Sequence, residues 1–522
     1  MMEKYFKTLK ASTPMQWQNS ITKNIEIRLL FCLMVLLILL RFILGIIYPI
    51  FSDACQYLYI AKHPSLLINP HFNYYPPLLM IIGAAIFPIL GEFGLKLIAP
   101  FFGAIGIIYT YKLGKELFDE KRGLIAAIIL GIIPSHIYLS AMPYQDAVVT
   151  GLLTVFIYYF YRALISEKDE VKAGIIAGLT ALSKLTGAIV FPIIALYYIA
   201  TLIKNKIFNK EIFKKCLTMA AIGLLVCSPY YIRTYFLFGT LLGFRISTPK
   251  VETFTLTSNF DESLFNKEIS QRFAVYRDST VFDYAKEVYL DFWGIPWGVK
   301  VSGIPDVAIP AFTLVTILIS FFLLYGIIRG LRAEGQNIIF VHIWLIAWII
   351  SILILKEQLI WGFRRLLPMA PAIALLAARG FNVKTMKYKK LFYLMLAFIV
   401  IILPATQVAK AWYAYTYFEK YSDALQYIKT LPEDSIILIH DVEQCLYYAE
   451  KKSYHIGQLK PEFLNITTLK TYNITHVVRF EHYLFLDLSE HVKRIDEMAM
   501  RGELKLVWES EYVKVYEVVA KN

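Results

Sequence analysis

Charged residues are scarce in this chain of 522 residues. Asp, Glu, Lys and Arg make up 18% of it, whereas soluble globular domains carry about 25%. Apolar residues make up 57%, and the mean hydropathy is +0.54. A chain with this balance cannot hide its apolar side chains in a water-soluble core, which excludes an ordinary soluble protein.

Motifs for metal or nucleotide binding are absent from the sequence. The five cysteines show no CxxC or metal-ligand spacing, and the nine histidines form no HExxH pattern. His136 and His342 lie in apolar stretches and are interpreted as packing residues. No Walker, Rossmann or DxD pattern occurs either, so neither ATP nor a soluble nucleotide sugar is indicated as the direct substrate.

Long apolar runs dominate what the chain does contain. Each is long enough, as a helix rising 1.5 Å per residue, to cross about 30 Å of hydrocarbon. The clearest runs are Leu29–Ile50, Ala308–Tyr325, Ile338–Leu355 and Leu391–Ala409. The sequence therefore predicts a polytopic α-helical membrane protein.

The net charge of +13 lies mainly in short loops between these runs. This distribution indicates membrane topology and not nucleic-acid binding, because Lys and Arg collect in cytoplasmic loops. Loops near 112–122, 204–215, 329–332 and 379–390 are predicted to be cytoplasmic, as is the N-terminus. The segments predicted to lie outside are then the loops at about 51–75 and 237–307, the turns near 141–146 and 184–187, and the stretch 356–365.

The segment Pro77–Leu90 is too short for this alternation. As a helix it measures about 21 Å, and Pro88 and Gly91 interrupt it. We interpret it as a short helix that dips into the membrane from outside, which leaves about eleven full crossings. A short true crossing stays open as the alternative.

The composition changes after about residue 415. Short amphipathic helices and apolar strands alternate there, which is typical of an α/β domain. Helices are predicted at Asp423–Thr430, Pro461–Tyr472 and Leu488–Arg501, and strands at Ser435–His440, Thr475–Phe480, Leu504–Ser510 and Tyr512–Val519. The chain is thus divided into a membrane module, 1–415, and a soluble extracytoplasmic domain, 416–522.

Two acidic residues beside crossings are candidates for chemistry, because acidic groups at the membrane are costly. Asp53 follows the first crossing, and Asp146 lies in the turn near 141–146. Each begins a helix, so each fits a helix cap as well as a catalytic role. Both are predicted on the same face of the membrane, which favours a shared site.

Cations are predicted on that same outer face. By the positive-inside rule they lie on the unusual side, which favours an anionic partner such as a lipid phosphate. The alternative for each is a long side chain that reaches the headgroups. These cations are Lys184, Arg233, Arg364 and Arg365.

Several short motifs follow one another along the chain. They are Asp-Ala-Cys-Gln-Tyr-Leu-Tyr-Ile-Ala (53–61), Tyr-Pro-Pro-Leu (75–78), Pro134 with Asp146 downstream, Gly-Leu-Thr-Ala-Leu-Ser-Lys (178–184), Pro-Tyr-Tyr-Ile-Arg-Thr-Tyr-Phe-Leu-Phe-Gly (229–239) and Arg-Arg-Leu-Leu-Pro (364–368). In this order the motifs resemble the GT-C superfamily of polyprenyl-phosphate-sugar-dependent glycosyltransferases. The nearest groups are the dolichyl-phosphate-mannose-protein mannosyltransferases and the aminoarabinose transferases.

The resemblance implies an inverting transferase that moves a sugar from a polyprenyl-phosphate donor to a hydroxyl of a lipid, glycan or protein acceptor. It implies Asp53 as catalytic base and Asp146 as a second carboxylate, and it implies phosphate-binding or site-lining roles for Lys184 and Arg233. We add Arg364 or Arg365 as a phosphate ligand. Asp146 would orient the acceptor, the sugar or a divalent metal ion, and Tyr57 and Tyr75 are expected to line the site.

Two departures narrow this expectation. Ala54 follows Asp53 where the protein mannosyltransferases have a glutamate, which argues against a protein acceptor. Tyr74 and Tyr75 precede the Pro-Pro pair where aminoarabinose transferases carry charge, which removes one expected phosphate contact. The rival interpretation is a secondary transporter or lipid flippase, although the sequence shows no internal repeat of the kind common in transporters.

Overall fold

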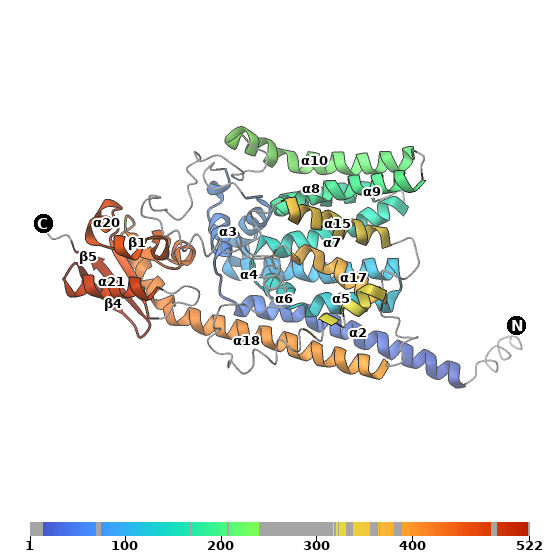
Figure 1. The fold of residues 1–522 in the computed structure, drawn as a ribbon, viewed down its shortest axis with the longest axis horizontal. Coiled ribbons are helices and arrows are strands. Elements are labelled where there is room, and N and C mark those ends of the chain that lie inside the picture. The colour runs from blue at the N-terminus through green and yellow to red at the C-terminus, as the bar shows by residue number, and fades with distance from the viewer. Residues whose placement is uncertain are drawn as a thin grey trace, which may run out of the picture.

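The computed structural model has two parts, a helical bundle and a small sheet, joined by one long helix (Figure 1). The beginning of the first helix and the sheet lie at opposite ends of the long axis. The structure describes residues 14–68, 75–165, 169–205, 208–239, 317, 320–321, 323–329, 338–354, 364, 366–380, 389–481 and 488–519.

The helices of the bundle are α2 (Pro14–Ile47), α3 (Asp53–Lys62), α4 (Leu78–Leu117), α5 (Glu120–Ile132), α6 (Pro134–Ala141), α7 (Gln145–Ile165), α8 (Glu170–Ser183), α9 (Val190–Asn205), α10 (Lys210–Phe238), α15 (Ile339–Ile354), α17 (Ala370–Gly380) and α18 (Lys389–Thr430). Three of the predicted apolar runs lie in α2, α15 and α18 of the bundle, and most of the fourth, Ala308–Tyr325, lies outside the described residues. Among the described residues, five helices are long and apolar enough to cross a membrane, and the bent pair α5 and α6 would make a sixth. These spans establish a polytopic helical membrane fold. The expected total of about eleven crossings stays a prediction, because part of the chain lies outside the described residues.

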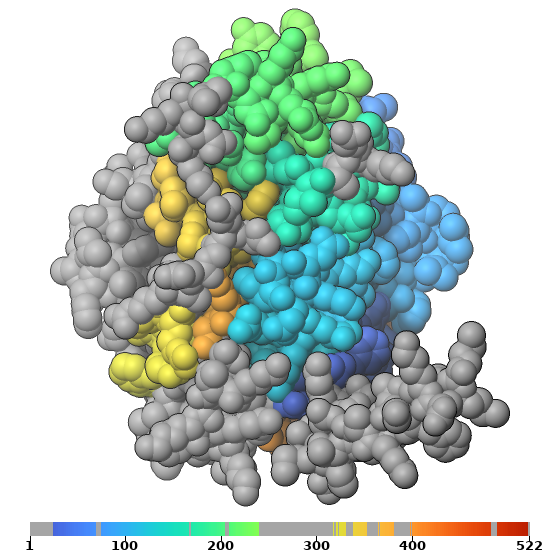
Figure 2. Space-filling model, turned by 90° about the vertical axis from the view of Figure 1, so that its right-hand side faces the viewer, coloured from blue at the N-terminus to red at the C-terminus, as the bar shows by residue number. Residues whose placement is uncertain are grey.

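Basic and acidic side chains at the helix ends group at the end of the bundle away from the sheet. Figure 2 views this end of the bundle. Arg162 lies in the last turn of α7. Its Nε is 2.9 Å from Asp169 Oδ2, and its Nη1 is 3.7 Å from Oε1 of Glu116, near the end of α4. Lys121 pairs with Glu26 of α2 at 2.5 Å. The loops predicted to be cytoplasmic therefore share one end wherever the structure describes them.

Helix α4 is folded back on itself at Gly91. This glycine has φ 58° and ψ −147°, a conformation that residues with a Cβ rarely adopt. A Cβ on Gly83 would lie 3.2 Å from Leu95, whereas residues twelve apart in a straight helix are about 18 Å apart. The segment 78–90 is therefore separate from the helix that follows, as expected. Its position relative to the bilayer stays a prediction.

The chain also bends between α5 and α6, by 69°. Pro134 begins α6, and a proline supplies no backbone N–H to the turn before it. The buried guanidinium of Arg41 donates to the carbonyl oxygen of Gly131 at 3.0 Å and contacts His136 Nδ1 at 2.8 Å. Arg41 thus satisfies a carbonyl that the bend leaves without its helical partner. His136 is a buried packing residue, as predicted, but it is also part of this polar contact.

The C-terminal segment forms a five-stranded mixed sheet in the order β2-β1-β3-β5-β4. Alternate side chains of β1 point to two separate cores, with Ile437 and Ile439 toward α18 and Leu438 toward α21. This period of two is what a strand covered on both faces requires. The elements are β1 (Ile436–Ile439), α19 (Val442–Gln444), the π-helical turn η7 (Cys445–Ala449), β2 (Lys452–His455), α20 (Ile466–Thr471), β3 (His476–Phe480), α21 (Ser489–Met500), β4 (Leu504–Glu509) and β5 (Val513–Val518).

The structure of this segment differs in detail from the sequence predictions. The predicted helix Pro461–Tyr472 is a 3-10 turn, Pro461–Phe463, followed by the separate helix α20. The predicted helix Asp423–Thr430 is the end of α18, which runs without a break through the expected boundary at residue 415. The short strand β2 was not predicted, because its four residues, Lys452–His455, carry no apolar alternation. The division at 415 is therefore not a break in the backbone, and the two parts are joined by a continuous helix.

The C-terminal segment packs directly on the bundle through η7. Tyr447 is fully buried in the same cluster as Leu44, Leu58 and Met80. The hydroxyl of Tyr448 accepts a hydrogen bond from the Ile50 backbone N–H at 3.2 Å. These contacts place α19 and η7 against α3, the helix that begins with Asp53.

Candidate active site

Asp53 is the first residue of α3, immediately after the first long helix. Ser52 occupies the N-cap position with φ 50°, in the left-handed region that is costly for a residue with a Cβ, and its side chain makes no capping bond. The Asp53 carboxylate accepts a hydrogen bond from Arg364 at 2.7 Å. Its side chain is 34% exposed, so it is both paired and accessible to a ligand.

Asp146 lies in the first turn of α7 and is fully buried. Lys184 Nζ donates to its Oδ1 at 2.5 Å, and Arg364 donates to its Oδ2 from Nε at 3.1 Å and from Nη2 at 2.9 Å. Burying a carboxylate is costly unless it is paired and hydrogen-bonded, and both of its oxygens are. The pairing with Lys184 and Arg364, and not helix capping alone, explains how the charged side chain of Asp146 can be buried here.

Lys184 is the C-cap residue that follows α8, where the chain turns sharply before α9. The turn brings Gly187 so close to α8 that a Cβ there would lie 1.9 Å from the Thr180 carbonyl oxygen. The Gly187 N–H donates to the Lys184 carbonyl at 2.8 Å. A glycine is therefore needed to hold the turn that presents Lys184 to Asp146.

Arg364 joins the two carboxylates. Its three hydrogen bonds to Asp53 and Asp146 involve Nε and both Nη atoms. A guanidinium has five N–H donors, so two remain beyond these three bonds. The Cζ atom of Arg364 lies 4.6 Å from the ring centroid of Tyr144, which is a cation–π contact. Tyr144 was not singled out from the sequence, although it stands only two residues before Asp146.

The predicted site-lining tyrosines, Tyr57 and Tyr75, contact each other edge to face, with ring centroids 5.2 Å apart. The side chain of Gln145 donates to the carbonyl oxygen of Pro76 at 3.0 Å. Gln145 therefore ties the Pro-Pro segment to the start of α7, next to Asp146. This role could not be predicted, because a glutamine at a helix start has no special signature.

One predicted cation, Arg233, is not part of this cluster of Asp53, Asp146, Lys184 and Arg364. It donates instead to the carbonyl oxygen of Ile68 at 2.9 Å, within the segment 51–75 that is predicted to be an outer loop. Arg365 lies outside the described residues, as does most of the outer loop 237–307.

The described residues contain no group of three His, Cys, Asp or Glu side chains suited to one metal ion. Asp53 and Asp146 are the carboxylates that this cluster offers, and the guanidinium of Arg364 bonds to both.

Helix α7 shows how far the cluster lies from the other end of the bundle. Asp146 lies in the first turn of the helix and Arg162 in its last turn, a rise of about 24 Å between the two residues. The cluster lies at the end that faces the sheet, because α3 packs on α19 and η7. The two carboxylates and both described cations that contact them thus occupy one end of the bundle.

Known proteins of similar fold share this architecture. ArnT from Cupriavidus metallidurans bound to undecaprenyl phosphate has a TM-score of 0.56 at 12% identity, over 94% of this chain and 98% of that one. The archaeal oligosaccharyltransferase AglB from Archaeoglobus fulgidus, in complex with an inhibitory peptide and a dolichol-phosphate, has a TM-score of 0.52 at 16% identity, over 86% of this chain and 69% of that one. Another structure of the Archaeoglobus fulgidus oligosaccharyltransferase, in complex with Zn and sulfate, has a TM-score of 0.54 at 17% identity, over 86% of this chain and 68% of that one.

The fold is therefore that of a polytopic helical membrane protein with the same architecture as these structures. Residues 74–232 match the dolichyl-phosphate-mannose-protein mannosyltransferase family. No curated protein sequence matches the chain. The family match and the structural matches together support the GT-C superfamily of glycosyltransferases, as the sequence motifs predicted.

Proposed function

We propose that this protein transfers a sugar from a polyprenyl-phosphate donor to an acceptor hydroxyl, with inversion at the anomeric carbon. The observation that carries the proposal is the cluster of two carboxylates and two cations at one end of the bundle. Two of the similar structures hold a dolichol-phosphate and undecaprenyl phosphate, which supports a donor of that kind.

Asp53 is the catalytic base in this mechanism. It is the accessible carboxylate of the pair, 34% exposed against 0% for Asp146. Asp53 takes the proton of the acceptor hydroxyl while the acceptor oxygen bonds to the anomeric carbon. The bond from that carbon to the phosphate oxygen breaks, and its electron pair leaves with the lipid phosphate.

Lys184 and Arg364 stabilise the departing phosphate. Both are held by the buried carboxylate of Asp146, so they are oriented before the donor arrives. Preorganised donors of this kind stabilise charge that develops in the transition state. Arg364 keeps two N–H groups beyond its bonds to the carboxylates, and Arg233 and Arg365 remain further candidates for the phosphate.

The location of the reaction follows from the charge pattern. The basic helix ends lie at the other end of the bundle, which favours the cytoplasm for them and the outer face of the cell membrane for the cluster. The C-terminal segment, 416–522, is then extracytoplasmic. Polyprenyl-phosphate sugars carry their own leaving group, so this site would need no nucleotide.

The test is the Asp53→Asn variant, assayed with a synthetic polyprenyl-phosphate sugar and membrane lipid extract. Loss of a general base lowers the rate by about 10²–10⁴-fold. Asp423→Asn, on the exposed side of α18, is the control and keeps full activity. Full activity of Asp53→Asn would eliminate this base. Lipid movement across proteoliposomes without sugar transfer would instead favour the flippase alternative.

A further inference from the structure

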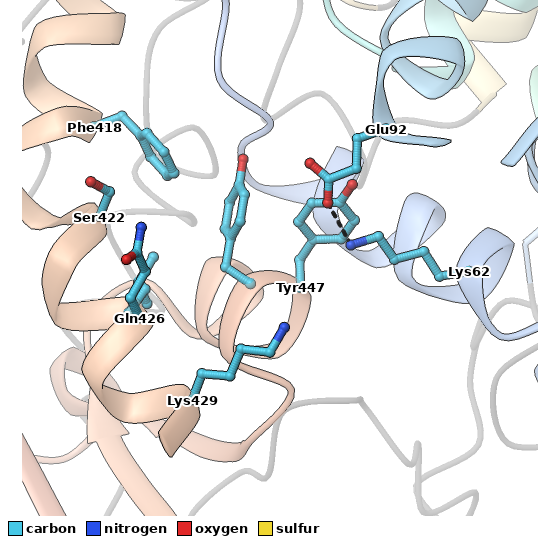
Figure 3. A pocket seen from close by; sticks show the side chains of 9 residues that line it. Lys62, Glu92, Phe418, Ser422, Gln426, Lys429 and Tyr447 are labelled. Atoms are coloured by element: carbon cyan, nitrogen blue, oxygen red, sulfur yellow. Dashed lines mark hydrogen bonds and ion pairs between the residues drawn. The ribbon is translucent and has the colours of Figure 1, made fainter. Parts of the chain in front are cut away.

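A pocket of about 290 Å³ lies where the C-terminal segment meets the bundle. This volume is at the lower end for small-molecule sites, which suits a compact headgroup. Figure 3 shows side chains of α18 on one side and Tyr447, Lys62 and Glu92 on the other. The lining residues are Lys62, Glu92, Phe418, Ser422, Leu425, Gln426, Lys429, Tyr447 and Tyr448.

The walls of the pocket come from three distant parts of the chain. Phe418, Ser422 and Gln426 share one face of α18, at the spacing of successive helical turns. Lys62 ends α3, and Glu92 follows the fold-back of α4 at Gly91. The pocket therefore exists only because α18, η7 and the α4 hairpin meet.

An ion pair makes one wall rigid. Lys62 Nζ lies 2.7 Å from Glu92 Oε1 and 3.9 Å from the ring centroid of Tyr447. The Lys62 side chain is 13% exposed and that of Glu92 is 48% exposed, so the carboxylate stays accessible to a ligand. The ion pair fixes a carboxylate, an ammonium group and an aromatic ring in one place.

The chemistry of the pocket is mixed and not purely cationic. Gln426 and Ser422 can both donate and accept hydrogen bonds, Lys429 donates, and Glu92 accepts. Phe418 and Tyr448 add aromatic surface, with ring centroids 4.9 Å apart. A ligand rich in hydroxyl groups satisfies such a set, because each hydroxyl both donates and accepts.

Apolar side chains beside the pocket are exposed. Next to Glu92, Ile89 is 80% exposed and Phe93 is 53% exposed, while Trp412 is 64% exposed on α18. In a membrane protein such side chains face lipid, and aromatic residues collect at the interface with water. A ligand in the pocket can therefore keep a hydrocarbon tail in the bilayer.

Helix α3 links the pocket to the cluster. Asp53 begins this helix and Lys62 ends it, so the two lie about 14 Å apart along its axis. This separation exceeds one sugar ring, so an acceptor reaching both places must be extended. We propose that the pocket binds the carbohydrate headgroup of a membrane glycolipid, which is the acceptor of the reaction. Its role as acceptor rests on the function proposed above, whereas binding itself does not.

The test measures protection of Lys429, which is exposed, from an amine-acylating reagent. The full chain is placed in phosphatidylcholine nanodiscs with or without a diglucosyl diacylglycerol, and acylation is read by peptide mass spectrometry. At twice its dissociation constant the glycolipid slows acylation of Lys429 about threefold. Lys493, exposed on α21, is the internal control and is unaffected.

Variants make the assignment specific. Gln426→Ala abolishes the protection, whereas Asp423→Ala, one turn away on α18 and outside the pocket, leaves it intact. Equal protection by phosphatidylglycerol would identify an anionic-headgroup site, and no protection by either lipid would show that the pocket binds neither; both results overturn the proposal. Asp53→Asn protein is tested in parallel and keeps the protection, so a failed catalytic assignment and a failed binding site are distinguishable.

Discussion

Two carboxylates that are far apart in the chain, Asp53 and Asp146, are hydrogen-bonded to one guanidinium, that of Arg364. Arg fits this task better than Lys, because its planar fork presents donors in several fixed directions. The negative charge of the buried Asp146 is paired with Lys184 and Arg364, while the Asp53 carboxylate stays accessible. At the residue scale, the chemistry therefore divides between a buried carboxylate that positions cations and an exposed one that can accept a proton.

A third carboxyl group, Glu443 of α19, interacts electrostatically with Asp53. The pKa of Glu443 is raised from 4.5 to about 7, chiefly by burial and also by the negative charges of Asp53 and Asp441, against a backbone hydrogen bond that lowers it. Burial also raises the pKa of Asp441. Acidic groups of the C-terminal segment thus lie beside the beginning of α3.

This pKa predicts that stability falls as pH rises from about 4.5 to about 7. In that window the unfolded chain has already lost the Glu443 proton, whereas the folded chain still holds it, so the slope of unfolding free energy with pH is negative. Because the side chain is partly exposed, we expect a loss of ~2 kcal/mol. Thermal unfolding of the purified protein across this range measures the effect. Glu443→Gln removes this part of the pH dependence, and an unchanged profile would contradict the assignment.

At the scale of elements, short breaks in helices place the site. The chain breaks at Gly91, at the bend before Pro134 and at the turn after Lys184. The turn after Lys184 presents that side chain to Asp146, and the fold-back at Gly91 places Glu92 beside Lys62, because a continuous helix would carry the chain past these partners. The apolar runs alone would have formed longer helices here.

Gly187→Ala is expected to damage the turn after Lys184. An added Cβ would meet the Thr180 carbonyl oxygen at 1.9 Å, so the backbone has to move. We expect a loss of about 1–3 kcal/mol of stability, as is usual for overpacking, together with a drop in transfer rate. Thermal shift and donor turnover measure both effects. Gly106→Ala, where the nearest atom would be 3.6 Å away, is the control and is tolerated; equal tolerance of both variants would contradict the prediction.

At the scale of the whole molecule, the sheet and the bundle are coupled by a continuous helix and by η7. Helix α18 packs its last turns on one face of the sheet, while α21 covers the other. Tyr447 and Tyr448 of η7 are built into the bundle. The C-terminal segment therefore contributes to the walls around the site and is not a separate appendage.

Tyr448→Phe is expected to loosen this attachment. The change deletes the hydroxyl that accepts the Ile50 N–H and leaves that buried donor unsatisfied, at a cost of about 1–3 kcal/mol. Limited proteolysis and thermal unfolding should then separate the C-terminal segment from the bundle. Tyr427→Phe, which keeps the ring stacked on Trp508, is the matched control. A single unchanged transition in the Tyr448 variant would show that the hydrogen bond contributes little.

The sequence predicted much of this molecule because its strongest signals are local. Apolar length predicted the membrane helices, and alternation predicted strands β1, β3, β4 and β5 to within about two residues. Asp53, Asp146, Lys184 and Arg364 were also predicted, from the cost of charge at a membrane and from the family motifs. Their roles remain proposals.

Only the tertiary structure decided which of these groups meet. Hydrogen bonds between Arg364, Asp53 and Asp146, and the turn at Gly187, depend on helices that pack across long stretches of chain, and helical periodicity carries no information about such pairs. The same holds for the contact of η7 with α3 and for the pocket at Lys62. Local physics determined the elements of this protein, and packing between distant elements decided its site.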